Sequence, residues 1–86
     1  MRELLTELHR HRDPHVGLIR VADVVRAMLS HAPLEAIHEG LLTLAKHGTL
    51  ELRPDGGTEF LKDDFKVCPR GPRDTVFAYA RWLDAP

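Results

Sequence analysis

The chain has 86 residues, of which 43% are hydrophobic and 29% charged. A chain this short supports one domain with one core, and it is too short for two domains or a deep substrate cleft. Its twelve Lys and Arg against thirteen Asp and Glu leave a net charge of −1, which differs from the basic excess of most small nucleic-acid-binding proteins. No apolar run approaches the ~18 residues of a membrane span. The single cysteine, Cys68, excludes an internal disulfide framework and fits a reducing cytoplasm.

Two helices and a short strand are expected in the first thirty residues. Leucines at helical spacing predict a helix from Arg2 to about Arg12, which ends at Asp13 because the residue before a proline leaves the α region. A brief strand near Leu18–Arg20 follows, since this stretch is short and partly β-branched. The next helix covers 22–29, where one helical stripe carries the apolar side chains: Val21, Val24, Val25, Met28 and Leu29.

The third helix, over residues 34–47, has the clearest pattern. Its apolar positions recur at intervals of three and four and predict the buried side: Leu34, Ile37, Leu41, Leu44 and Ala45. The other positions are expected to face outward: Glu35, His38, Glu39, Leu42, Thr43 and Lys46. Pro33 suits the first turn and Gly48 supplies a left-handed cap at the end. Gly40 in mid-helix costs ~1 kcal/mol relative to alanine and therefore indicates a close packing contact.

The second half of the chain is less regular. Residues 49–53 alternate polar and apolar side chains and predict a half-buried strand, and 54–57 form a turn. Within 58–74, prolines and a glycine at 69–72 exclude regular structure. Residues 75–83 are rich in β-branched and aromatic side chains and are predicted as a strand, although one helical face also fits them. The expected core draws on all these segments: Leu5, Leu8, Ile19, Val24, Val25, Met28, Ile37, Leu41, Leu44, Leu50 and Leu52.

This order of elements resembles the winged-helix (winged helix-turn-helix) superfamily over nearly the whole chain. The most specific stretch runs from Pro33 to Leu52, which looks like the third helix of that superfamily passing through a glycine into the first wing strand. The resemblance implies an α+β fold, a three-helix core with a small antiparallel β-sheet, in a single domain over 1–86 with the wing and C-terminal strand at about 49–83. Members commonly place the third helix in the DNA major groove and the wing against the backbone, whereas many others bind proteins with the same surfaces.

Two functions are therefore expected as alternatives: a DNA-binding transcriptional regulator or accessory factor, and a protein–protein interaction module without DNA binding. If double-stranded DNA is the partner, side chains of the third helix and the wing would contact it: His38, Leu42, Thr43, Lys46, Arg53, Lys62, Lys66, Arg70 and Arg73. Glu35 and Glu39 favour the second alternative, because carboxylates at the entry to the groove repel phosphates. Neighbouring prolines make Arg70 and Arg73 comparatively stiff, so less freedom is lost when they meet a phosphate or a carboxylate.

Catalytic, metal and cofactor sites are not expected, and neither is an enzyme. His9 and His11 are two positions apart on a helix and point in different directions, and with His15 they lack the thiolate or acid that would complete a zinc site. Cys68 has no histidine base beside it in the sequence and is predicted to be a half-buried structural thiol, with an intermolecular disulfide as the alternative. Ser30 is the only serine and lies in a connection, so no Ser-His-Asp arrangement is available.

Aromatic residues are concentrated near the C-terminus. Phe77, Tyr79 and Trp82 are three of the five aromatic residues in the chain. A strand would point Phe77 and Tyr79 opposite to Trp82, so its unburied side would be an apolar patch that favours self-association. We therefore expect a homodimer through this segment. The alternative is that these rings fold back over the first helix.

Overall fold

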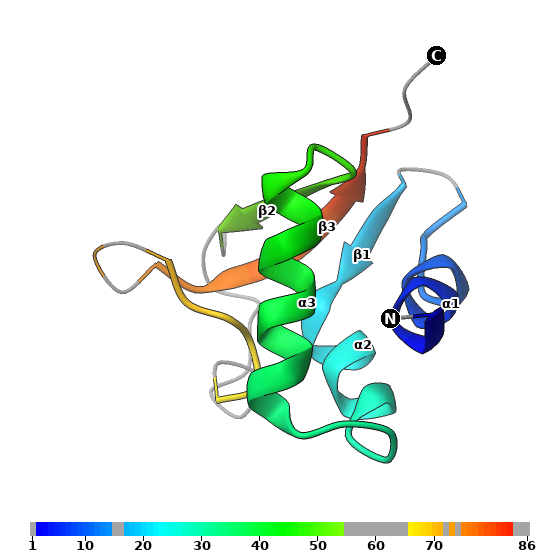
Figure 1. The fold of residues 1–86 in the computed structure, drawn as a ribbon. Helices are drawn as coiled ribbons and strands as arrows, with labels where there is room; N and C mark the ends of the chain where they lie inside the picture. Colours follow the sequence, from blue (N-terminus) through cyan, green and yellow to red (C-terminus); the bar gives the residue numbers. More distant parts are fainter. Residues whose placement is uncertain (1, 15–16, 55–65, 72, 74, 84–86) are drawn as a thin grey trace.

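Three helices and three strands make up the part of the chain that the computed structural model describes, which is residues 2–14, 17–54, 66–71, 73 and 75–83 (Figure 1). Their order is α1 Arg2–Arg10, β1 Leu18–Arg20, α2 Val21–Met28, α3 Leu34–Lys46, β2 Leu50–Pro54 and β3 Phe77–Trp82. This is the α+β composition that the sequence predicts, and the last segment is a strand rather than a helix. None of the described helices has the length and apolar character needed to cross a membrane.

The strands form one antiparallel sheet in the order β1-β3-β2, so the last strand of the chain lies between the other two. Ile19, Ala80 and Leu52 are partners across the sheet and lie on the side that faces the core. Figure 1 shows α3 crossing in front of β2 and β3. The alanines at positions 78 and 80 of the central strand are fully buried, and their short side chains leave room for the helices to pack closely on the sheet.

The core lies between the helices and this side of the sheet. Most of the side chains predicted to form it are buried: Leu8, Ile19, Val24, Val25, Met28, Ile37, Leu41 and Leu50. Leu44 and Leu52 are partly buried against the core, but the prediction for Leu5 is wrong because that residue is 37% exposed. Leu4 takes the buried position on α1 instead, since residues four apart, such as Leu4 and Leu8, lie on one side of a helix.

The aromatic residues of β3 have separate surroundings. Trp82 stacks on His9 of α1, with ring centroids 4.6 Å apart and 17° between the ring planes, which matches the alternative to dimerisation. Phe77 lies against Gly71, where an added Cβ atom would come within 2.6 Å of the Phe77 ring. Tyr79 is half-buried, and its partners on the two neighbouring strands are arginines. The three rings therefore do not form one continuous apolar patch.

Candidate nucleic-acid interface

The side of α3 that points away from the core carries most of the side chains predicted to meet a partner. Five of the six side chains expected to face outward are exposed: Glu35, Glu39, Leu42, Thr43 and Lys46. They border one shallow depression along the helix. Ile37 and Leu41 on the opposite side are fully buried, and this burial sets the rotation of α3 about its axis.

His38 is the exception on this side of α3. It is half-buried, and its Nε2 lies 2.6 Å from the backbone carbonyl oxygen of Val67. Because a carbonyl oxygen only accepts hydrogen bonds, Nε2 is the donor in this contact. The outward orientation expected for His38 is therefore not observed. The contact holds the segment that contains Val67 against α3. In that segment Cys68 is 2% exposed and Pro69 is fully buried. The Cys68 thiol is therefore buried more deeply than the half-buried position predicted for it.

The two arginines expected in the wing lie on a narrow turn just before β3. Arg70 and Val76 pair as an antiparallel bridge, and the Gly71 N–H donates to the Thr75 carbonyl oxygen at 2.7 Å. Arg73 has φ 59, a left-handed backbone conformation that is unfavourable for a residue with a Cβ atom. Both arginines are exposed, and Figure 1 shows this turn projecting from the domain on one side of α3.

The described residues of α3 and of the loop before β3 carry several exposed charged side chains. We call Lys66, Arg70 and Arg73 the loop cations. Together with the five exposed α3 side chains they form the α3–loop face. This face combines four positive side chains, the loop cations and Lys46, with two negative ones, Glu35 and Glu39. Within the described residues, this face therefore holds more positive than negative side chains, although the whole chain has a net charge of −1, and positive side chains attract anionic partners.

Two of the residues predicted to contact DNA are not part of the α3–loop face. Arg53 follows the partly buried Leu52 on β2, so its side chain points to the side of the sheet away from the helices. Its Nε lies 3.5 Å from the Glu51 carboxylate. Arg53 thus lies apart from the loop cations that it was expected to assist. Lys62 lies outside the described residues.

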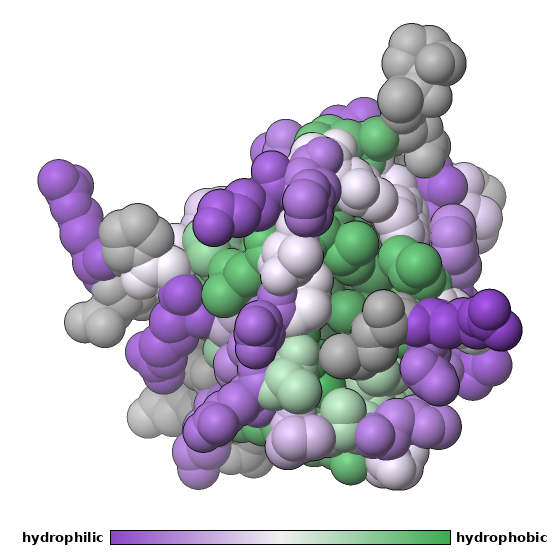
Figure 2. Space-filling view, in the orientation of Figure 1, coloured by the Kyte–Doolittle hydropathy of each residue, from purple (hydrophilic) through white to green (hydrophobic). Residues whose placement is uncertain are grey.

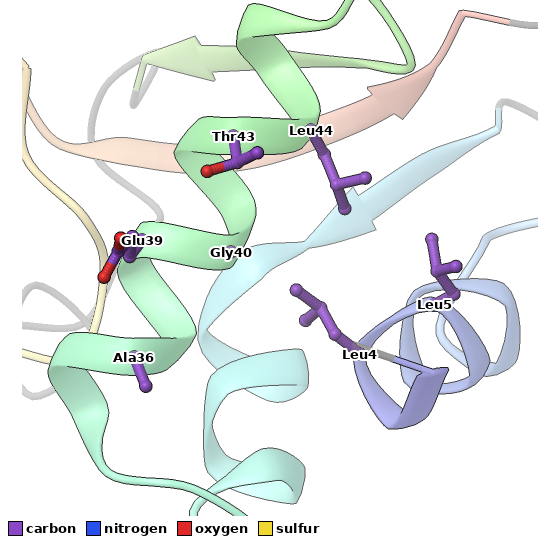
Figure 3. A pocket seen from close by; sticks show the side chains of 7 residues that line it. All are labelled: Leu4, Leu5, Ala36, Glu39, Gly40, Thr43 and Leu44. Atoms are coloured by element: carbon purple, nitrogen blue, oxygen red, sulfur yellow. The ribbon is translucent and has the colours of Figure 1, made fainter.

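An apolar groove with a volume of about 360 Å³ separates α1 from α3. Figure 3 shows Leu4 and Leu5 on its α1 side and Leu44 on its α3 side, and Figure 2 shows hydrophobic side chains gathered between these two helices. Gly40 lies on the α3 side as well, and the close packing contact expected at this glycine stays a prediction. The described residues that line it are Leu4, Leu5, Ala36, Glu39, Gly40, Thr43 and Leu44.

The histidines near the N-terminus do not converge on one point. His9 stacks on Trp82, whereas the Nε2 of His11 lies 3.5 Å from the Glu7 carboxylate. His15 lies outside the described residues. Within the part of the chain that the structure describes, no three His, Cys, Asp or Glu side chains are placed to hold a metal ion.

Comparisons with known proteins were made for the whole chain. No family model matches it, no curated protein matches it, and no solved structure matches it. What the chain does must therefore follow from the geometry and charge of its own surfaces.

Proposed function

We propose that this chain is a small winged-helix DNA-binding protein that acts as a transcriptional regulator or accessory factor. In the complex, α3 lies in the major groove and the loop before β3 is the wing on the phosphate backbone. Three helices with a three-stranded antiparallel sheet, and a loop that joins β2 to β3, support this layout. The observation that carries the proposal is the 2.6 Å contact between His38 and Val67, because it fixes to α3 the segment that begins with Lys66 and leads to Arg70.

The side chains of the α3–loop face divide into two groups in this complex. The loop cations pair with phosphates, which positions the protein but reads no base sequence. Thr43 and Lys46 are the α3 side chains suited to base edges or to phosphates at the groove. Glu35 and Glu39 repel phosphates, and a glutamate that reaches a base edge accepts a hydrogen bond from cytosine N4. The two acids therefore reduce affinity for DNA in general and restrict how α3 enters the groove.

A titration of a fluorescently labelled random duplex at two salt concentrations tests the proposed function. With four phosphate contacts, from the loop cations and Lys46, affinity is expected to fall about a hundredfold between about 50 and 200 mM salt, because each neutralised phosphate releases counterions. The measurement is fluorescence anisotropy at each salt concentration. No binding of the parent chain at ~50 mM salt would contradict DNA binding.

The second candidate function is a protein–protein interaction module without DNA binding, and exposed apolar side chains favour it. Leu42 is 41% exposed and lies on the same side of α3 as Glu39, and Leu5 borders the apolar groove beside α1. A helix that carries apolar and basic side chains would suit these surfaces. This function predicts no affinity for a random duplex at low salt, so the same titration separates the two candidates.

The homodimer through the C-terminal segment stays a prediction. Trp82 is covered by His9, so the exposed Leu83 is the large apolar side chain that this end of β3 offers to a second copy within the described residues. A dimer of winged helices would bind two half-sites at once. Light scattering at micromolar protein concentration is expected to give twice the 9.7 kDa mass of the chain. A single species of 9.7 kDa would contradict the dimer.

A further inference from the structure

The side of the sheet that faces away from the helices carries two aligned rows of side chains. Arg20 on β1, Tyr79 on β3 and Arg53 on β2 are partners across the sheet, so their side chains point to the same side. The adjoining row consists of Leu18, Arg81 and Glu51. We call these six residues the outer sheet face. Tyr79 is central, with an arginine on each neighbouring strand.

The helices do not cover the outer sheet face. The residues that alternate with it along the three strands belong to the core, so the helices pack on the opposite side of the sheet, which is the near side in Figure 1. The Arg20 and Arg53 side chains are 53% and 50% exposed, and Tyr79 is half-buried between them. With ~4.8 Å between neighbouring strands, the two arginine Cα atoms lie about 10 Å apart across the tyrosine.

Positive charge dominates this face. It holds three arginines and one glutamate. Arg53 lies 3.5 Å from Glu51, and Arg20 lies 3.8 Å from Asp23 of α2. Ion pairs between side chains this exposed contribute little to stability, so a polyanion can replace them at small cost. The face therefore combines an aromatic ring with cations on both sides of it.

We propose that the outer sheet face binds single-stranded DNA, at a site separate from the α3–loop face. An aromatic ring on a flat sheet gives an unpaired base a surface on which to stack, and arginines on either side pair with the phosphates next to that base. Bases within a duplex stack on one another and are not available to such a ring. The nucleic-acid strand thus crosses the sheet with one base on Tyr79 and neighbouring phosphates at Arg20 and Arg53.

Two other polyanions fit this face less well. An acidic peptide would pair with the arginines but would leave the Tyr79 ring without a stacking partner. RNA is distinguished from DNA by contacts to the 2′-hydroxyl. Glu51 is the carboxylate on this face, and it is already engaged with Arg53. The arginine and tyrosine side chains pair with phosphates and stack on bases of either nucleic acid. RNA of the same sequence is therefore expected to bind no more tightly than DNA.

Fluorescence anisotropy with the full chain and a labelled oligothymidylate of about twelve nucleotides tests the site. Tyr79→Leu is expected to weaken binding about tenfold, because it removes one base-stacking contact, whereas Tyr79→Phe keeps the ring and the affinity. Arg20→Gln combined with Arg53→Gln is expected to flatten the salt dependence of single-strand binding by about 1.4, as for two lost phosphate contacts. Arg2→Gln is the matched control, because Arg2 is an exposed arginine on α1. It should change neither the affinity for the oligothymidylate nor the salt dependence of that affinity.

Thermal melting first establishes that each variant is folded. If Tyr79→Leu is not folded, the site is tested with Arg20→Gln combined with Arg53→Gln instead. The proposal is overturned if the parent does not bind the oligothymidylate, if Tyr79→Leu binds like the parent, or if RNA or polyglutamate binds more tightly. It is also overturned if Arg70→Ala with Arg73→Ala abolishes single-strand binding, because the strand would then lie on the α3–loop face. Single-strand binding without duplex binding would contradict the proposed function and support this site.

Discussion

Arg70→Ala combined with Arg73→Ala is expected to weaken duplex binding about tenfold to a hundredfold at moderate salt, evenly across DNA sequences. Both side chains are exposed, so their removal leaves the core intact. Alanine also has a Cβ atom, so the cost of the left-handed backbone at position 73 is kept in the variant. Because two phosphate contacts are lost, the slope of log affinity against log salt should become flatter by about two.

Anisotropy titrations of parent and double variant, each at several salt concentrations, measure both quantities. Arg2→Ala on α1 is the control for loss of an exposed arginine elsewhere and should leave the slope unchanged. If the loop cations bind a protein instead, they pair with its carboxylates, and the double variant then has no effect on DNA titrations. A double variant with the affinity and slope of the parent removes the loop from the DNA-binding surface.

Leu41→Ala is expected to lower the free energy of unfolding by about 2–5 kcal/mol. Leu41 is fully buried on the inner side of α3, where truncation removes apolar contacts and leaves a cavity in a close-packed core. A domain of this size has a total stability of only ~5–10 kcal/mol. The variant should therefore melt far below the parent or be largely unfolded at 37 °C.

The neighbouring residue supplies the control for this change. Leu42→Ala makes the same chemical substitution one position along α3, but Leu42 is exposed, so its cost should stay within about 0.5 kcal/mol. Urea unfolding of parent and both variants gives the free energies. Equal stability of Leu41→Ala and the parent, or equal losses for the two variants, would show that the inner side of α3 has been assigned incorrectly.

Features that lie within one element could be predicted from the sequence. The apolar repeat of α3 predicted both the helix and its buried side, because the helical period places Ile37 and Leu41 on one face whatever they pack against. The alternation around Leu50 and Leu52 predicted β2 in the same way. The β-branched and aromatic content of 75–83 favoured a strand over a helix, and the segment is a strand in the structure.

Features that join distant segments were decided only by the tertiary structure. Periodicity placed His38 on the outer side of α3, and no local pattern indicates that Val67, 29 residues further on, accepts its hydrogen bond. Leu4 and Leu5 are equally apolar, and the way α1 docks selects Leu4 for the core. The arginines on either side of Tyr79 come together because β3 inserts between β1 and β2. Local periodicity determines which residues share a face, whereas the faces that meet depend on many weak contacts between segments far apart in the chain.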